Sequence, residues 1–528
     1  MDHLSPLDAA FLELEDGDSN ASLSLASVAV LEGPPPSHAD FVRSITVRLP
    51  LIPRHRQKIH RVPLDLGPPV WVDDDRFDAA RHFHRVAVPA PGGERELCEL
   101  VALLMGERLD RDHPLWEFWV MEGLSGGRWA VLSKLHHCVA DGVTGNELLK
   151  VLFTDAAAGT ATAGPAPDLG TVDLLKDAAR RLLLTPARQL RAVVRLALSP
   201  SRAVREIADA LSGLRAFTSA LIPAARSSLS GPVGPDRRYE VAHTSLDDVH
   251  GICRAFEVTV NDVALAAVTG AFRALLLRRG EEPVPNAMRA LVPVSVRGGH
   301  DTVGNEVSLM LPLLPVDVPD PAGRLVAVHR RSAALKASKE AEAGAALTGV
   351  AASAPFAPVA WAVRLAAGLP QHNVVSVVTN VPGPRTPLTS LGREVEDLYP
   401  YVPVALRLRT GVAVLSYRDK LNFGITLDFA SAPDAGFLAK AIEADVLALA
   451  RIARRSRPGA DGLVDGVREQ HDRNGGEGQH PAERARHGTA EKPRQGRHQE
   501  EHRQHREFED DREQQQRVSP QPDPADPA

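Results

Sequence analysis

The chain has 528 residues, more than one ordinary hydrophobic core needs and enough for two domains with additional segments. Apolar residues make up 44% of it and the formal net charge is −6, which is typical of a globular protein and gives no reason to expect a nucleic-acid partner. Its three cysteines have neither a disulfide pattern nor a zinc spacing, so we expect a cytoplasmic protein without a bound metal.

Residues 1–155 mix strand-like and helical stretches and form the first predicted half. Trp129–Leu135 (WAVLSKL) has the composition of a strand, and Val143–Phe153 (VTGNELLKVLF) has the period of a helix following it. The segment HHCVADG, His136–Gly142, lies between them. Side chains at a strand end are held by a rigid scaffold beside a cleft, and adjacent ones point to opposite sides. One histidine is therefore expected in the cleft while the other faces the scaffold.

Histidine is the side chain best suited to proton transfer near neutral pH, so this segment is a candidate source of a general base for an attacking hydroxyl. Asp141 falls at the start of the following helix, where it can cap backbone N–H groups or pair with an arginine. Cys138 as a nucleophile is disfavoured, because adjacent side chains seldom meet productively. A zinc site is disfavoured because no Glu or His follows at a ligand spacing.

Residues 156–235 form a predicted linker and helical crossover. The segment opens with AAAGTATAGPAPD, and then an apolar stripe around Leu190 lies opposite Arg188, Arg191 and Arg195. Such a basic amphipathic connector suits an anionic membrane surface. It suits equally well a position between two domains with solvated arginines, and the sequence leaves both interpretations open.

Residues 236–457 form the second predicted half. Asn261 is expected to open a helix through DVALAAVTGAFRALLLR, because Asn or Asp there can cap the N-terminus. Apolar residues at helical spacing from Phe437 to Ile452 indicate a closing helix. Three predicted strands are Arg289–Arg297, Val374–Val378 and Val412–Tyr417.

Two further segments differ from their surroundings. Gly344 to Val363 is an uncharged run about long enough to span a bilayer, but Pro355 and Pro358 interrupt it. We predict a buried or interfacial helical segment there. Residues 458–528 are rich in Arg, Glu, Gln and His, and too poor in apolar side chains to offset the entropy of ordering, so a disordered polar tail is expected.

Motifs distributed along the chain carry a family resemblance. They are LSPLDAAFLELE, HPLWEFWVMEGL and HHCVADG in the first half, and TVNDVALA, VPVSVR, GNEVS, NVPGP and LSYRDKLNFGITLD in the second. From Leu4 to about Arg454 the chain resembles the bacterial wax ester synthases/diacylglycerol acyltransferases. HHxxxDG alone is shared with condensation domains of peptide synthetases and other coenzyme A-dependent acyltransferases, and the other motifs select this family among them.

The resemblance implies an α/β fold of the α+β kind, with two chloramphenicol-acetyltransferase-like domains of mixed sheets flanked by helices and joined by the helical crossover. The active site would be a tunnel at their interface. His137 would be the general base and His136 a supporting residue. Asp141 would be structural, paired with Arg297, and Gly142 would let the backbone turn tightly. The candidate tunnel residues are Asn261 (also a possible oxyanion donor), Asp262, Arg297, Gly304, Asn305 and Asn380.

The resemblance further implies O-acyl transfer from fatty acyl-CoA to the hydroxyl of diacylglycerol or a long-chain alcohol, in a ternary complex without metal or cofactor. Because these substrates are apolar, a cytoplasmic position peripheral to the inner membrane or to lipid droplets is expected. One rival is a condensation-type acyltransferase with a carrier-protein thioester or an amine acceptor, against which the absence of a carrier domain argues. Another is an inactive lipid-binding or droplet-coating protein, against which the intact HHCVADG argues.

Overall fold

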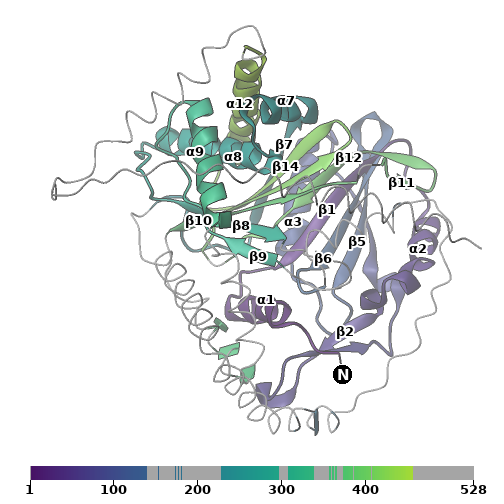
Figure 1. Cartoon of the computed structure of the whole chain (residues 1–528). Coiled ribbons are helices and arrows are strands. Elements are labelled where there is room, and N and C mark those ends of the chain that lie inside the picture. Colours follow the sequence, from purple (N-terminus) through teal and green to yellow (C-terminus); the bar gives the residue numbers. More distant parts are fainter. Residues whose placement is uncertain are drawn as a thin grey trace, which may run out of the picture. The chain divides into compact units, whose positions relative to one another are not determined.

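Two six-stranded sheets carry the fold (Figure 1). The computed structural model describes residues 2–139, 227–295, 307–337, 373–384, 386–405 and 407–455, with single residues at 153, 173, 176, 177, 180, 356, 357, 360, 361, 363 and 364. All of them belong to one compact unit, Met1–Arg468. The predicted α/β class with mixed sheets is confirmed, because each sheet combines parallel and antiparallel pairs.

The first sheet has the order β11-β12-β1-β6-β5-β4 and the second the order β7-β14-β13-β10-β8-β9. The strands of the first are β1 (Ser24–Leu31), β4 (Phe83–Ala87), β5 (Trp116–Leu124), β6 (Arg128–His136), β11 (Thr389–Ser390) and β12 (Arg393–Tyr401). Those of the second are β7 (Arg237–Ser245), β8 (Arg289–Ser295), β9 (Val307–Met310), β10 (Val374–Val381), β13 (Thr410–Tyr417) and β14 (Lys420–Asp428). A separate hairpin pairs β2 (Gln57–His60) with β3 (Val70–Asp73).

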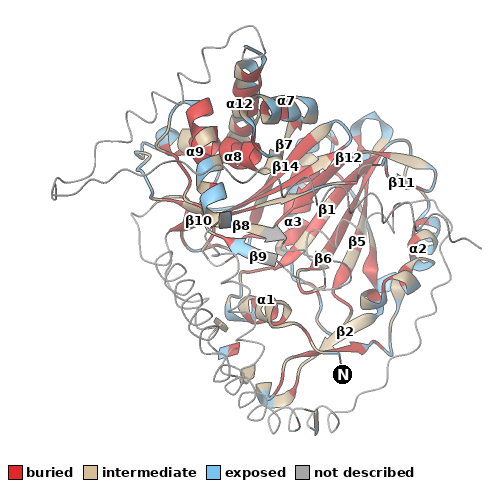
Figure 2. Ribbon diagram, viewed as in Figure 1, coloured by how far each residue is buried: buried red, intermediate tan, exposed pale blue. Residues whose placement is uncertain are grey.

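The α-helices with described bounds are α1 (Pro6–Gly17), α2 (His38–Thr46), α3 (Glu94–Gly106), α7 (Leu246–Phe256), α8 (Val260–Arg278), α9 (Pro321–Ala337) and α12 (Ala435–Arg455). Short 3-10 turns occupy Leu49–Leu51, Pro53–Arg56, Pro63–Asp65, Ala79–His82 and Ser125–Gly127. Helices α7, α8, α9 and α12 cover one face of the second sheet with a continuous apolar core, shown in red in Figure 2. The predicted strands at β6, β8, β10 and β13 and the closing helix α12 are confirmed.

One strand crosses the predicted division of the chain. β12 follows residue 236 in sequence, yet it pairs antiparallel with β1 of the first sheet, with Tyr399 opposite Val28. Its Pro400 carbonyl also accepts a hydrogen bond of 2.8 Å from the Tyr239 hydroxyl of β7. The division into halves at 1–155 and 236–457 remains a prediction. Strands β11 and β12 come from the second predicted half but belong to the first sheet, whose other strands come from the first half.

The N-terminus of α8 corrects one expectation. Thr259, not Asn261, caps the helix: its hydroxyl accepts the Asp262 N–H at 3.2 Å, and the Asp262 carboxylate accepts the Thr259 N–H at 3.0 Å. Thr259 is the cap because it lies one position before the first helical residue. From there it forms a reciprocal pair with Asp262, three residues later, that satisfies two free backbone N–H groups. Among the described helices α8 alone is long and apolar enough to cross a membrane, and it packs as a core helix with 72% of that stretch buried.

Several predictions fall outside the described residues. They are the helix Val143–Phe153 apart from Phe153, most of the crossover 156–235, most of the uncharged run Gly344–Val363, and the tail 458–528.

Candidate active site

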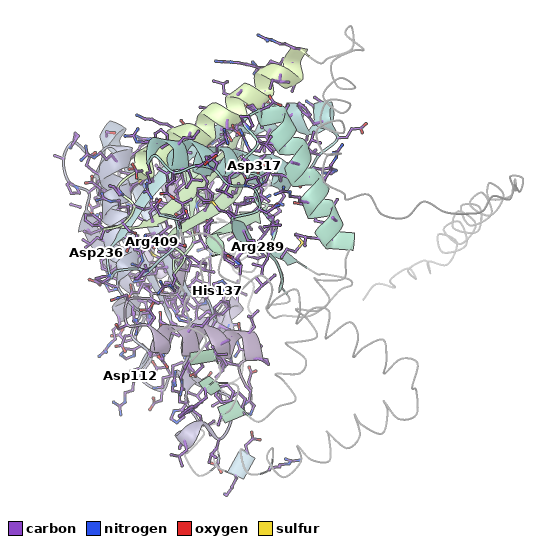
Figure 3. All side chains as sticks on the ribbon, turned by 90° about the vertical axis from the view of Figure 1, so that its left-hand side faces the viewer. Asp112, His137, Asp236, Arg289, Asp317 and Arg409 are labelled. Atoms are coloured by element: carbon purple, nitrogen blue, oxygen red, sulfur yellow. The ribbon has the colours of Figure 1, made fainter. Side chains whose placement is uncertain are left out.

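The histidine pair lies where the first sheet meets α1. β6 ends at His136, which is opposite Ser24 in the antiparallel register with β1. The His136 side chain is 1% exposed, whereas His137 is half-buried. Figure 3 labels His137, whose ring stacks on Phe11 of α1 with centroids 3.9 Å apart and planes 24° apart. The pair is thus placed at a strand end, as the sequence predicts.

The imidazole of His136 is fixed from both sides. The backbone N–H of Cys138 donates to its Nδ1 at 3.2 Å, and the Cys138 thiol lies 2.9 Å from the same nitrogen. In the neutral ring this leaves the proton on Nε2, which faces the Glu15 Oε2 at 3.5 Å. His136 therefore lies against the scaffold and cannot turn freely.

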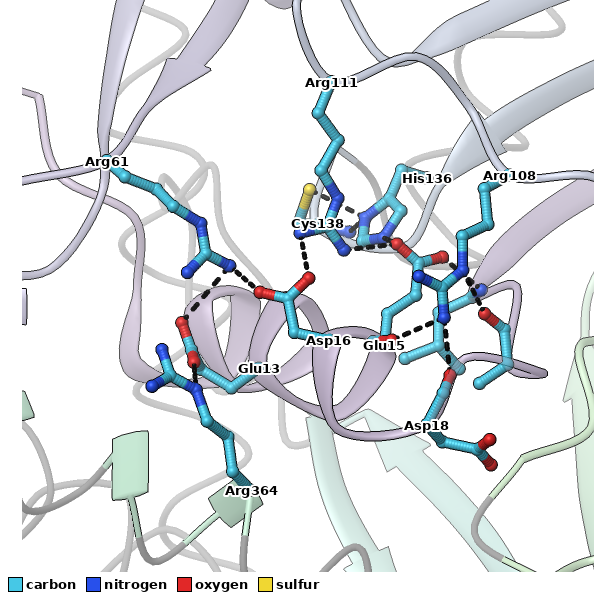
Figure 4. A network of polar contacts seen from close by, with 12 residues as sticks. Glu13, Glu15, Asp16, Asp18, Arg61, Arg108, Arg111, His136, Cys138 and Arg364 are labelled. Atoms are coloured by element: carbon cyan, nitrogen blue, oxygen red, sulfur yellow. Dashed lines mark hydrogen bonds and ion pairs between the residues drawn. The ribbon is translucent and has the colours of Figure 1, made fainter.

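The backbone of His137 is held by Leu23, the residue before β1. Its N–H donates to the Leu23 carbonyl at 3.0 Å. The Leu23 N–H in turn donates to Glu15 Oε1 at 2.9 Å. One carboxylate on α1 thus reaches His136 directly (Figure 4), and it reaches His137 through one residue, Leu23.

Glu15 is buried in a cationic environment. Its side chain is 2% exposed and pairs with Arg111, whose other nitrogen lies 2.5 Å from Asp16. Burial raises the pKa of Glu15, but the hydrogen bonds from His136, Arg111 and the Leu23 N–H outweigh burial and lower the pKa to about 2. Glu15 is therefore ionised at any pH near neutrality.

A second buried carboxylate lies two residues earlier on α1. Glu13 pairs with Arg364 and lies 3.6 Å from Arg61, and Arg364 also binds Asp65 at 3.0 Å. Burial raises the pKa of Glu13, although both arginines oppose the shift. Sequence reasoning missed Glu13 and Glu15. The available signal was two acidic residues within FLELE, where an amphipathic helix facing a core would carry apolar side chains.

Cys138 lacks the environment of a nucleophile. Its side chain is 4% exposed, and burial raises the pKa of its thiol well above the usual value, with nearby Asp8 and Glu15 adding to the effect. A reactive cysteine needs a stabilised thiolate, and this site disfavours one. Among the described residues no group of three or more His, Cys, Asp or Glu side chains could hold a metal ion.

The HPLW segment, at the start of β5, packs in the core. Leu115 and Trp116 are each 1% exposed, and the Trp116 indole N–H donates to the His55 carbonyl at 2.8 Å. His82 stacks on the same indole, with centroids 4.2 Å apart. HPLW therefore contributes core beneath the strand next to β6, and a direct chemical role is not needed to explain it.

Of the remaining candidates, three lie within the described residues and five lie outside them. Asp262 belongs to a different cluster from Glu15: its carboxylate accepts from the Thr259 hydroxyl at 2.8 Å and lies 2.9 Å from His329 Nδ1. Asn261 is half-buried on the first turn of α8, and Asn380 is half-buried on β10. Asp141, Gly142, Arg297, Gly304 and Asn305 lie outside the described residues, and with them the predicted Asp141–Arg297 pair.

Asn380 begins the NVPGP segment, whose backbone lies very close to that of β13. In NVPGP the Gly383 N–H donates to the Ser416 hydroxyl at 3.0 Å. A Cβ on Gly383 would lie 1.6 Å from the Ser416 carbonyl oxygen, so only glycine permits this approach. The NVPGP turn is thereby fixed against the second sheet.

Two family models cover most of the chain. The wax ester synthase/diacylglycerol acyltransferase catalytic domain matches residues 4–264, and the C-terminal domain of the same family matches residues 303–449. The chain is also 45% identical over 462 residues to the probable diacylglycerol O-acyltransferase tgs1 of Mycobacterium tuberculosis, which covers 87% of this chain and 97% of that protein. The chain belongs to the wax ester synthase/diacylglycerol acyltransferase family. It is therefore an acyltransferase, as its motifs imply.

Other similarities agree with this family and fold. A second putative diacylglycerol O-acyltransferase of Mycobacterium tuberculosis is 36% identical over 86% of this chain and 92% of its own length. The solved wax ester synthase/diacylglycerol acyltransferase from Marinobacter aquaeolei VT8 matches with a TM-score of 0.58 and 24% identity, over 85% of this chain and 99% of that one. The first condensation domain of the calcium-dependent antibiotic synthetase matches with a TM-score of 0.55 and 16% identity, over 88% and 99%. At these identities the two structures show the fold alone.

Proposed function

We propose that this acyltransferase moves a fatty acyl group from acyl-CoA to the hydroxyl of diacylglycerol, of a long-chain alcohol, or of both. The substrate assignment is supported by the names of its relatives, above all the tgs1 protein. The observation that carries the mechanism is the fixed position of His137, a half-buried imidazole at the end of β6 with its backbone bound to Leu23 and its ring stacked on Phe11.

His137 would act as the general base in a ternary complex. Its imidazole removes the acceptor's hydroxyl proton while the oxygen attacks the thioester carbonyl, giving a tetrahedral intermediate. Collapse breaks the C–S bond, forms the ester and releases the CoA thiolate, which takes up the proton from the imidazolium. No covalent acyl-enzyme is required, in agreement with the buried Cys138 thiol.

The direct test is product analysis with labelled palmitoyl-CoA and either diacylglycerol or hexadecanol, comparing wild type with His137→Ala. We expect labelled triacylglycerol, wax ester or both from wild type, and a loss of about 10²–10⁴-fold in the variant. Undiminished synthesis by His137→Ala would refute the base assignment. Amide formation with an amine acceptor, or turnover only with a carrier-bound donor, would favour a condensation-type reaction instead, and lipid binding without turnover would indicate an inactive binding protein.

We propose peripheral association with an anionic membrane or lipid-droplet surface, supported by the apolar nature of both substrates and the basic stripe in the crossover. The test is flotation with anionic liposomes, comparing wild type with a variant in which Arg188, Arg191 and Arg195 are changed to Glu. Weaker flotation of the variant is expected. Equal binding by both proteins would show that these arginines do not contribute to membrane association.

A further inference from the structure

We infer that Glu15 is a positioning residue for the histidine pair, and that the Glu15–Arg111 ion pair determines where the base is held. This inference rests on the proposed role of His137. None of the sequence motifs assigns such a role to Glu15, whose carboxylate contacts Leu23, His136 and Arg111.

The first contact, with the Leu23 N–H, acts on the backbone of His137. Glu15 Oε1 accepts the Leu23 N–H at 2.9 Å, and the Leu23 carbonyl accepts the His137 N–H at 3.0 Å. Leu23 is 6% exposed and precedes β1, and a buried N–H that loses its acceptor is costly. Without Glu15 the Ser22–Leu23 peptide loses this acceptor, and a shift of Leu23 would also displace its carbonyl, which accepts the His137 N–H.

The second contact fixes His136. Glu15 Oε2 faces its Nε2 at 3.5 Å, while the Cys138 N–H holds Nδ1 on the opposite side of the ring at 3.2 Å. A carboxylate on one side and an N–H donor on the other select a single ring orientation and tautomer. Because His136 directly precedes His137, this also fixes the start of the turn that carries the base.

Arg111 holds the carboxylate in this geometry. It binds Glu15 and Asp16 together, so the end of α1 is joined to the segment between α3 and β5. Arg108 adds a hydrogen bond of 2.6 Å to the Glu15 carbonyl. Within the described residues, the charged or titratable groups that interact with Glu15 or with its neighbour Cys138 are Asp8 and Asp16 of α1, Arg108 and Arg111 between α3 and β5, Lys134 and His136 of β6, and Cys138 itself.

Glu13 provides a matched control. Both carboxylates are 1% exposed as residues, both lie on α1, and both pair with an arginine. Glu13 binds Arg364 and lies near Arg61, whereas Glu15 alone reaches Leu23 and His136. A role that is only structural should therefore affect Glu13→Gln and Glu15→Gln alike, while a positioning role should separate them.

The experiment measures kcat and KM for palmitoyl-CoA, with thermal unfolding, in wild type, Glu13→Gln, Glu15→Gln and Glu15→Ala. We expect Glu15→Ala to lower kcat by about 10–100-fold with KM within about twofold, since misplacing a catalytic group by about 1 Å costs up to about 100-fold. Glu15→Gln keeps an acceptor for the Leu23 N–H, so its kcat should fall less than that of Glu15→Ala. Glu13→Gln should keep kcat within about twofold.

Equal kcat in Glu15→Ala and wild type, or equal losses in Glu13→Gln and Glu15→Gln, would overturn the inference. Absence of ester synthesis by wild type would refute the proposed function instead. In that case the crystal structure of Glu15→Ala decides the inference without an activity assay. A displaced His137 supports it, and a His137 still bonded to the Leu23 carbonyl and stacked on Phe11 overturns it.

Discussion

Gly424 of β14 allows the two sheets to approach each other, and Gly424→Ala should disrupt that contact. A Cβ at this position would lie 1.7 Å from the Pro400 carbonyl oxygen of β12 and 2.9 Å from the Tyr239 hydroxyl. Real Cβ atoms essentially never come closer than 3.0 Å, so β12 and β14 would have to separate by about 1.3 Å.

The neighbouring atom belongs to the backbone of a strand that pairs with β1, and it cannot move aside as a flexible side chain would. Overpacking costs typically about 1–3 kcal/mol, and rigid backbone on both sides places Gly424→Ala at the upper end. Loss of the Tyr239–Pro400 hydrogen bond adds about 1 kcal/mol. We therefore expect the free energy of unfolding to fall by about 3–4 kcal/mol.

The assay is urea-induced unfolding followed by circular dichroism, with Gly251→Ala as the control. Gly251 lies within α7, and a Cβ there would have no atom within 4 Å. Because alanine is the better helix former, the control should gain about 0.5–1 kcal/mol. A Gly424→Ala protein with the unfolding midpoint of wild type would show that the close approach of β12 to β14 is not required, and the reasoning would fail.

Three further predictions concern the site and the tail. Cys138→Ala should keep kcat within a few-fold of wild type, and the native thiol should resist maleimide because burial raises its pKa; a 100-fold loss in a folded variant would restore the nucleophile hypothesis. The pKa of Glu15 is lowered to about 2, so its contribution to stability is complete above about pH 4.5 and is lost as the pH falls towards about 2. Wild type should therefore lose more stability than Glu15→Gln between about pH 5 and 3. If the urea midpoints of the two proteins fell equally over this pH range, the predicted role of the Glu15 charge would be wrong. Truncation after Arg455 should leave kcat and thermal stability unchanged, and a clear loss of either would give the segment 458–528 a role.

Local patterns in the sequence predicted the elements that carry the site. The composition of WAVLSKL placed a strand before the histidine pair, and the structure ends β6 at His136. Apolar residues at helical spacing predicted α8 and α12, because period and composition are properties of neighbouring residues. The cap of α8 was misplaced by two residues, since Asn261 and Thr259 both suit a helix start and only the reciprocal pair with Asp262 decides between them.

Contacts between distant residues were decided by the tertiary structure. The pairing of β12 with β1 joins residues separated by most of the chain, and no local period reports which strand lies beside which. The same holds for α1, where Glu13 and Glu15 are favourable only because Arg364 and Arg111 come from positions 351 and 96 residues away. A buried carboxylate is costly until a cation and hydrogen-bond donors surround it. The sequence by itself therefore determined the histidine pair and its strand, while only the folded chain determined the carboxylate that holds that pair in place.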